Sequence, residues 1–478
     1  MLQEILPLDH DWKMLQEILP LDLDWKMLHE ILPLDRDWTM RHEILPLDRD
    51  WTMRHEITLD KPPGCQSMSW FTAEESTKDT HLEEPRTKGL PSEYAKEQQE
   101  PNRTEQVVLQ NPKPHKPDGF TLAKHVRDQC GPTADKYPAE ANEQFWIGRM
   151  HVIPAQKSMY CPVEKVGTTF WRRFIYQVLH PRKYRHPFQV PIGTALMADY
   201  PKPQKGATRK DISDLFKFMF VRNPYHRVLS AFVDKVFVPN PLFWRRFGKP
   251  SIQMFRVNDS RECFHDPTFA EFVQFVTWSE KNKKMIDPHF LMSTEMCLPC
   301  ASNFTFIGKM ESFKDDSLVI FERFNLSSLA TSMEKQMKTY AAEDAISDSI
   351  SSPFAWKKSI VSCMAWYDAL HRIWRKLQLR GLIEFDIKMP LNEKQAEKVT
   401  RAEMIKLANE AWKKSNPMKL KEQKTIAFNQ FYMSVPLRAL NELKDVFARD
   451  FYLFDYDKEP PEIFDRKREY ISVDYALK

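Results

Sequence analysis

Residues 161–173 read CPVEKVGTTFWRR, and this stretch decides how the surrounding chain is expected to fold. Just before it, residues 157–160 are short and partly apolar, which predicts a strand. Just after it, apolar side chains recur at helical spacing over residues 170–179. We therefore predict a strand, a tight turn at Gly167 and a helix that opens with two threonines.

Such a turn directs backbone N–H groups and the positive end of a helix at one point, which suits a phosphate. Lys165 adds a positive charge, and Thr168 and Thr169 add hydroxyl donors. The stretch is not the loop of nucleoside triphosphatases, because the G-x-x-x-x-G-K-[ST] spacing is absent. By itself it is equally compatible with an ordinary surface loop.

A second stretch repeats this pattern. Residues 216–221 predict a buried strand that ends at an Arg-Asn-Pro turn, and residues 225–232 predict the next helix. Arg222 then lies at the carboxyl edge of the strand, and Ser230 lies along the helix. A guanidinium and a hydroxyl together can hold a phosphate. The alternative is an arginine that caps the strand and a serine packed within the helix.

The two stretches, residues 162–171 and 222–231, resemble the paired nucleotide motifs of the Golgi carbohydrate sulfotransferases, the family of the chondroitin, dermatan and HNK-1 sulfotransferases. More blocks of resemblance follow in the family's order, at residues 287–290, 297–300, 304–311, 432–436 and 450–456. The resemblance covers roughly the last two thirds of the chain and is more specific than either nucleotide motif alone.

The resemblance implies the sulfotransferase fold, a P-loop-like parallel α/β sheet flanked by helices, with both motifs at carboxyl ends of strands. It implies transfer of a sulfuryl group from 3′-phosphoadenylyl sulfate (PAPS) to a hydroxyl of a glycosaminoglycan or a glycoprotein glycan. It further implies a glycan acceptor, no metal, no nucleic acid, and a place in the Golgi lumen or membrane. The alternative is a catalytically inactive protein on the same fold that binds a glycan or another partner.

By the same resemblance, the first motif grips the 5′-phosphosulfate and the second grips the 3′-phosphate. The implied donor-binding residues are Glu164, Lys165, Val166, Gly167, Thr168, Thr169, Phe170, Arg222, Arg227 and Ser230. Lys165 is expected to stabilise charge on the leaving phosphate, with Arg172 or Arg173 assisting. His289 is the expected base for the acceptor hydroxyl, with Glu311 as the rival base. The alternatives are a histidine packed beside its neighbours and a glutamate in a structural ion pair.

Composition limits the remaining classes. The 478 residues are 42% hydrophobic and 12% aromatic, which allows two to three domains with a large core. The net charge of +4 does not indicate bulk nucleic-acid binding. Cations outnumber acids over residues 157–186, which fits either a solvated basic face or a cleft for anions. A kinase would need a triphosphate loop and a metal-binding carboxylate, and neither is evident.

Seven cysteines leave at least one outside intrachain pairs. A four-thiolate zinc site is not expected, because no two C-x-x-C pairs occur. Cys297 and Cys300 can form disulfides in an oxidising compartment. Sequons for N-glycosylation also occur, and they fit passage through the secretory pathway.

The chain is expected to have four parts. Residues 1–56 are a tandem repeat of 13-residue units, and a proline in each unit interrupts any helix; the alternative is a multivalent binding arm with tryptophan anchors. Residues 57–143 predict a disordered polar stem, residues 144–460 the sulfotransferase domain, and residues 461–478 a tail. No apolar run of about 20 residues and no signal peptide are evident, so the Golgi location comes from the resemblance alone.

Within the domain, residues 304–307 predict a strand, and residues 239–264 predict a loop over the acceptor site. Helical patterns occupy residues 268–278, 392–413 and 437–447.

Overall fold

The computed structural model describes residues 118–131, 146–256 and 262–466, and the structural statements below concern these residues. They all belong to one compact unit of the chain. The predicted repeats, most of the predicted stem and most of the predicted tail lie outside the described residues.

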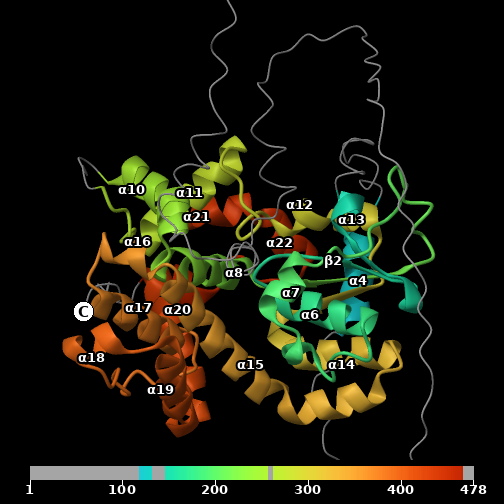
Figure 1. The fold of residues 1–478 in the computed structure, drawn as a ribbon. Coiled ribbons are helices and arrows are strands. Elements are labelled where there is room, and N and C mark those ends of the chain that lie inside the picture. The colour runs from blue at the N-terminus through green and yellow to red at the C-terminus, as the bar shows by residue number, and fades with distance from the viewer. Residues whose placement is uncertain (1–117, 132–145, 257–261, 467–478) are drawn as a thin grey trace, which may run out of the picture. The chain divides into compact units, whose positions relative to one another are not determined.

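A mixed sheet carries the fold (Figure 1). Its strand order is β1 (His151–Ile153), β2 (Ser158–Cys161), β3 (Phe216–Val221) and β4 (Phe306–Lys309). β1 runs antiparallel to β2, whereas β2, β3 and β4 are parallel to one another. The predicted α/β class is therefore confirmed, with one antiparallel strand added at the edge.

β3 is buried along its whole length, as a central parallel strand covered on both faces must be. Its sequence, FKFMFV, is a nearly continuous apolar run. The exception is Lys217, whose ammonium donates to the carbonyls of Ile212 and Ser213 at 3.0 and 3.1 Å. The lysine is therefore satisfied by backbone and does not disturb the core.

Each parallel strand leads into a helix. β2 is followed by α6 (Thr168–Leu179), β3 by α8 (Pro224–Ala231) and β4 by α14 (Phe313–Arg323). Aromatic rings fill the space between sheet and helices: Trp171 of α6 lies 4.7 Å from Phe220 between ring centroids. This alternation places the predicted motifs at the strand-to-helix connections.

α4 (Gly119–Cys130) corrects the predicted stem, because this part of residues 57–143 is a helix packed on the sheet. A Cβ at Gly119 would lie 2.3 Å from the ring of Phe306, so the helix approaches β4 closely. A disulfide joins Cys130 to Cys300. The helix is a single amphipathic segment within polar sequence, which is why composition alone did not separate it from the stem.

The sequence predicts a loop over residues 239–264, and this prediction is wrong for residues 241–255. The segment contains α9 (Pro241–Phe243), the π-helical turn η5 (Trp244–Gly248) and α10 (Lys249–Phe255). Trp244 and Phe247 are buried there, so these two aromatic residues belong to the core. Another π-helical turn, η4 (Phe232–Phe237), directly extends α8.

The predicted helices at residues 268–278 and 437–447 are confirmed as α11 (Phe269–Asn282) and α21 (Leu437–Val446). The helix predicted over residues 392–413 is two helices, α18 (Glu393–Lys398) and α19 (Arg401–Lys414). The break occurs because Thr400 caps α19 in a capping box with Glu403.

The remaining elements enclose three apolar cores. They are α7 (Ile192–Met197), α12 (Ser293–Cys297), α13 (Pro299–Ser302), α15 (Ser327–Ala355), α16 (Lys357–Val361), α17 (Trp366–Leu379), α20 (Pro417–Met433), α22 (Ala448–Leu453), α23 (Pro461–Phe464) and the short 3-10 turns η2 (Pro154–Gln156), η3 (Pro187–Gln189) and η6 (Met310–Ser312). The long α15 packs on α14 beside the sheet and on α17 and α19 in the helical part (Figure 1).

α23 also corrects the predicted tail boundary, because Ile463 is fully buried.

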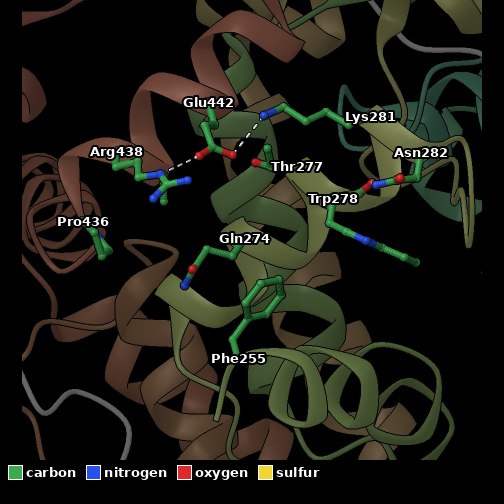
Figure 2. A pocket seen from close by; sticks show the side chains of 10 residues that line it. Phe255, Gln274, Thr277, Trp278, Lys281, Asn282, Pro436, Arg438 and Glu442 are labelled. Atoms are coloured by element: carbon green, nitrogen blue, oxygen red, sulfur yellow. Dashed lines mark hydrogen bonds and ion pairs between the residues drawn. The ribbon is translucent and has the colours of Figure 1, made fainter. Parts of the chain in front are cut away.

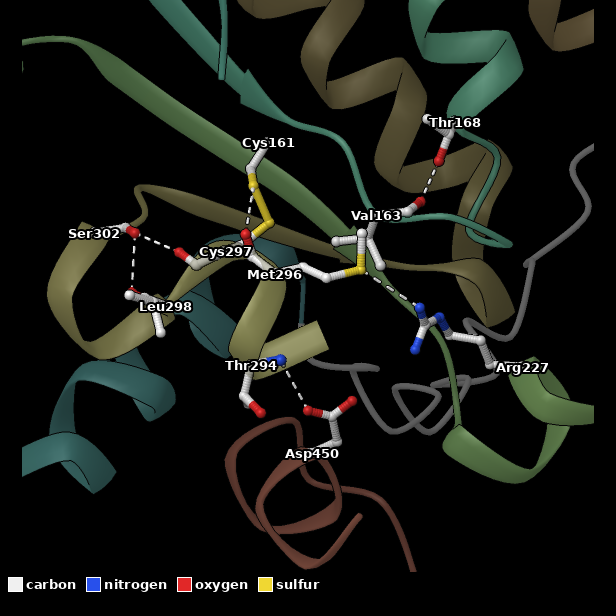
Figure 3. Close-up of a disulfide and its surroundings, with 10 residues drawn as sticks. All are labelled: Cys161, Val163, Thr168, Arg227, Thr294, Met296, Cys297, Leu298, Ser302 and Asp450. Carbon is white, nitrogen blue, oxygen red and sulfur yellow. Dashed lines mark hydrogen bonds between the residues drawn. A yellow bond between two sulfur atoms is a disulfide. The ribbon is translucent and has the colours of Figure 1, made fainter. Parts of the chain in front are cut away.

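Three disulfides cross-link distant segments: Cys130–Cys300, Cys161–Cys297 and Cys263–Cys363. The expectation that Cys297 and Cys300 form bridges is confirmed, and the seventh cysteine, Cys65, lies outside the described residues. Figure 3 shows how Cys161, at the end of β2, is tied to α12 next to the predicted donor loop. None of the described helices is both long enough and apolar enough to cross a membrane.

Candidate functional site

The carboxyl ends of β2, β3 and β4 bring the predicted motifs together, because parallel strands end at the same edge of a sheet. We call residues 162–169 the donor loop. Arg222, which follows β3, points a guanidinium nitrogen at the carbonyl of Lys165 across 3.5 Å. The backbone N–H of the next residue, Asn223, donates to Glu311 beyond β4 at 3.1 Å.

The donor loop turns sharply at two left-handed residues, Lys165 (φ 69°) and Gly167 (φ 83°). Glycine is required at the second position, because a Cβ there would lie 2.6 Å from the ring of Phe313. The Thr168 hydroxyl donates to the carbonyl of Val163 and closes the loop. No described side chain caps the start of α6, so its first N–H groups face the loop as they would face an anion.

The other loop residues divide by burial. Val166 and Phe170 are buried in the core, so only their backbone can contact a ligand. Thr169 is half-buried. Glu164 pairs with Arg172 at 3.6 Å. Burial opposes ionisation of this carboxyl, but nearby cations, Arg172 first, hold the pKa of Glu164 below its ordinary value.

Arg227 does not have the role expected of it. It is 1% exposed, and its guanidinium donates to the carbonyls of Glu164 (2.9 Å), Pro288 (2.9 Å) and Leu291 (2.6 Å). Figure 3 shows the guanidinium directed at Met296 beside the loop residue Val163. Arg227 is thus a structural bridge between the donor loop and the His289 segment, and we do not retain it as a donor ligand.

A carboxylate surrounded by lysines lies under the donor loop, and sequence reasoning missed it. Asp234 of η4 forms ion pairs with the ammonium groups of two lysines: Lys165 lies 2.6 Å from Oδ2, and Lys376 lies 2.8 Å from Oδ1. The ammonium group of Lys235 lies 3.5 Å from Oδ2. Burial lowers the pKa of Lys165 to about 8, although Asp234 opposes that shift. Burial alone would raise the pKa of Asp234, but Lys165 and Lys376 hold it well below its ordinary value. A signal was present: the Asp-Lys pair follows Ser230 at helical spacing.

A second group of cations surrounds Arg222. Burial lowers the pKa of Lys424, and Arg222 and Arg380 lower it further. Burial, followed by the positive charges of Arg222 and Lys424, lowers the pKa of His226 to about 3. Gly381 permits the crowding, because a Cβ there would lie 2.3 Å from Cδ of Lys424. Neighbouring cations repel one another, and an anion bound among them would relieve this repulsion. The group formed by Arg222, Arg380 and Lys424 therefore suits a phosphate.

Ser230, the second expected contact to the 3′-phosphate, is half-buried near the end of α8. It lies on the same short helix that Arg222 precedes. Arg173 does not face a ligand: it is buried and pairs with Asp344 of α15 at 2.6 Å.

His289 forms a dyad with a buried carboxylate. Its Nδ1 lies 2.6 Å from Oδ1 of Asp287, and Oδ2 of Asp287 lies 3.2 Å from Arg246. Burial opposes ionisation of Asp287, yet His289 and Arg246 hold its pKa below the ordinary value. When Nδ1 donates to a carboxylate, Nε2 is left as the acceptor that a general base needs.

Glu311, the rival base, is occupied. One oxygen accepts from the N–H of Asn223 and the other from the hydroxyl of Tyr456 at 2.9 Å. Both bonds fix the position of the strand-end segments. This favours the structural alternative for Glu311 and leaves His289 as the better candidate.

A separate pocket of about 340 Å³ lies between α11 and α21 (Figure 2). It is lined by Phe255, Gln274, Thr277, Trp278, Lys281, Asn282, Pro436, Arg438, Ala439 and Glu442. Glu442 pairs with Lys281 at 2.9 Å and with Arg438 at 3.2 Å, so both cations of the pocket already have a carboxylate partner. None of the expected site residues lines it, and we assign it no part in donor binding.

Part of the chain, including the donor loop and the His289 segment, is similar to known proteins. Residues 149–376 match the family model described as "Sulfotransferase family". Carbohydrate sulfotransferase 8 of Mus musculus is 28% identical over 235 residues, which cover 45% of this chain and 55% of that relative. Its Homo sapiens counterpart is 31% identical over 177 residues, covering 36% and 41%. Carbohydrate sulfotransferase 12 of Xenopus laevis is 27% identical over 254 residues, covering 48% and 56%.

The chain thus spans about half the length of the curated relatives it matches. No solved structure was found that matches it. A strand–loop–helix turn and a nearby group of cations lie at the carboxyl edge of the parallel strands, and such an arrangement suits a multiply charged anion. Residues 149–376 of the chain are similar to the sulfotransferase family, and the matched relatives are carbohydrate sulfotransferases.

Proposed function

We propose that this chain transfers a sulfuryl group from PAPS to a hydroxyl of a carbohydrate, on a glycosaminoglycan or a glycoprotein glycan. One observation carries the proposal: Arg227 joins the donor loop, through Glu164, to the segment that holds His289, through Pro288. A cationic donor loop and a histidine–carboxylate dyad are the two halves that sulfuryl transfer to a hydroxyl requires. The match of residues 149–376 to the sulfotransferase family model supports the same reaction.

The residues present fit the donor. The donor loop offers N–H groups and the Lys165 ammonium for the 5′-phosphosulfate. Arg222 and Ser230, with Arg380 and Lys424 near Arg222, offer positive charge and a hydroxyl for the 3′-phosphate. PAPS supplies the sulfuryl group, and no metal is needed to transfer it.

In the proposed reaction the acceptor oxygen forms a bond to sulfur while the bond from sulfur to the bridging phosphate oxygen breaks. Nε2 of His289 takes the hydroxyl proton, and Asp287 stabilises the imidazolium that results. Lys165 stabilises the charge that develops on the departing phosphate. Group transfer of this kind depends on positioning and charge neutralisation more than on covalent chemistry.

The relatives' printed names support a carbohydrate acceptor but give no position of sulfation. We propose the Golgi lumen or membrane as the location, because the disulfides Cys130–Cys300, Cys161–Cys297 and Cys263–Cys363 fit an oxidising compartment.

Transfer of labelled sulfate from PAPS to a panel of chondroitin, dermatan and N-glycan acceptors tests the proposal. The expected result is label in at least one acceptor with the wild-type chain and a large loss with Lys165→Ala. Binding of adenosine 3′,5′-bisphosphate is measured in parallel. A folded chain that binds this nucleotide but labels no acceptor would support the inactive alternative, and one that does neither would contradict the donor site.

A further inference from the structure

We propose that Asp234 is a positioning residue for Lys165: its carboxylate holds the Lys165 ammonium at the donor loop, keeps it protonated there, and releases it to an anionic donor. The two groups meet at 2.6 Å and are mostly shielded from water, with side-chain exposures of 14% for Lys165 and 20% for Asp234. That the anionic donor is PAPS rests on the proposed function, whereas the contact between Lys165 and Asp234 is independent of it.

The local fold directs Asp234 at the loop. Asp234 lies in the π-helical turn η4, directly after α8. A π-helical turn is wider than an α-helical one and re-aims the side chains that follow it, and such turns are frequent at functional sites. Lys165 itself has a left-handed backbone (φ 69°), which is unfavourable for a residue with a side chain. The contact with Asp234 helps to offset that cost.

The cluster is built so that Asp234 can lose one partner. Lys376 binds Oδ1 at 2.8 Å, while Lys165 binds Oδ2. A buried carboxylate left without a cation would be strongly destabilised. Because Lys376 remains in place, the Lys165 ammonium can move to a donor phosphosulfate without leaving Asp234 unpaired. One carboxylate and three lysines, −1 and +3, leave a charge of +2 for an anionic ligand.

Asp234 is also the group that keeps Lys165 charged. Three charged groups act on the Lys165 ammonium: Asp234 and Lys235 of η4, and Arg380 at the end of α17. Lys376 of α17 shares Asp234 with it, and Arg222 after β3 contacts the backbone carbonyl of Lys165. Most of them are cations, which oppose a further positive charge. Burial has already lowered the pKa of Lys165 to about 8, so removing Asp234 shifts the ammonium towards its neutral form at neutral pH.

The first test measures Lys165 directly and needs no enzymatic activity. Trace acetic anhydride labels lysines in the full chain between pH 5 and 11, and mass spectrometry quantifies the label on Lys165. The expected midpoint is near pH 8 for wild type, and about one pH unit or more lower for Asp234→Asn, which is a roughly fivefold or larger rise in labelling at pH 7. Glu442→Gln is the matched control, because Glu442 also pairs two cations but lies outside the site. Its midpoint should equal that of wild type.

A second variant keeps the test decisive if Asp234→Asn does not fold. Lys376→Met removes the competing cation and leaves Asp234 more fully to Lys165, so the Lys165 midpoint should rise. Its control is Lys217→Met, which removes another buried lysine, one that donates to the backbone carbonyls of Ile212 and Ser213. We expect the Lys165 labelling midpoint to fall in Asp234→Asn, to rise in Lys376→Met, and to stay at the wild-type value in both control variants. An unchanged Lys165 midpoint in the folded site variants overturns the proposal.

The second readout is the pH dependence of kcat/KM for sulfate transfer. Asp234→Asn should move the alkaline limb to lower pH, and Asp234→Glu should restore most of the wild-type profile. A purely structural role would reduce the rate equally at all pH values, and that outcome contradicts the proposal. If labelling shifts as expected while no chain, wild type included, transfers sulfate, the positioning role stands and the proposed function fails.

Discussion

Arg227 Nε donates to the backbone carbonyl of Glu164 at 2.9 Å. Through this bond the buried guanidinium of Arg227 holds the donor loop in place. The same guanidinium binds the carbonyls of Pro288 and Leu291, so it also sets where His289 lies relative to the loop. A ligand is therefore not needed to explain why an arginine stands at this position.

The first prediction is that Arg227→Ala acts on the fold. Three carbonyls would lose a charged donor inside the protein, which we expect to cost about 3 kcal/mol or more of unfolding free energy. Thermal unfolding and denaturant titration measure this loss. A variant that retains wild-type stability but binds adenosine 3′,5′-bisphosphate poorly would instead restore Arg227 as a donor ligand.

The second prediction is that Arg222→Ala acts on donor binding and leaves the fold intact. Arg222 makes a long contact to the Lys165 carbonyl and lies near the cations Arg380 and Lys424. Loss of a charge-assisted contact to the 3′-phosphate should weaken nucleotide affinity by about 2–3 kcal/mol, roughly 30- to 150-fold. Calorimetric titration with adenosine 3′,5′-bisphosphate checks it. Unchanged affinity in the folded variant would remove Arg222 from the site.

The pair Arg222 and Arg227 shows what sequence can and cannot supply. Strand and helix periodicity predicted β3 and α8 closely, since one buried apolar run and one helical repeat determine them. Whether each arginine points into the site or the core depends on which distant carbonyls lie nearby. Those carbonyls belong to segments about 60 residues away along the chain, and no local pattern encodes them.

The same limit explains Asp234 and Lys376. Their contact is made between η4 and α17, and in sequence each is one charged residue within a helical pattern. α4 was missed for a different reason: its amphipathic face is short, and its flanks are polar like the stem around it. By contrast, Gly167 was identified correctly as the turn, because its neighbours on both sides already predicted a strand and a helix.

The third prediction concerns truncation and follows from α4. Deleting residues 1–117 should leave stability and activity near wild type, because the described domain begins with the capping residue Asp118. Deleting residues 1–140 removes α4 and the Cys130–Cys300 disulfide, which should cost about 2–5 kcal/mol from the disulfide alone. Thermal unfolding of both truncated chains distinguishes the cases. If both truncated chains are equally stable, α4 contributes nothing to the stability of the domain. If the chain that lacks residues 1–117 is stable but inactive, the repeats have a part in the mechanism.

The fourth prediction separates the chemistry of Lys165 from that of His289. Lys165 acts on the leaving group, so Lys165→Ala should slow transfer to every acceptor, water included, by roughly a hundredfold or more. His289 acts on the acceptor hydroxyl, so His289→Ala should slow sugar sulfation by about 10²–10⁴ while nucleotide affinity stays near wild type. Single-turnover transfer and PAPS hydrolysis, measured side by side, show whether the two losses separate.

The pH dependence completes this test. A protonated imidazole cannot accept the hydroxyl proton, so wild-type sulfation should fall at acidic pH, and this fall should be absent from the residual activity of His289→Ala. Asp287→Asn is the companion variant, because it keeps the shape beside Nδ1 but removes the carboxylate that stabilises the imidazolium. It should lower the rate of sulfation without changing hydrolysis of PAPS. If wild type and His289→Ala share the same acidic fall, the base is another group, and Glu311 is then tested by Glu311→Gln, even though its two oxygens are bound by Asn223 and Tyr456.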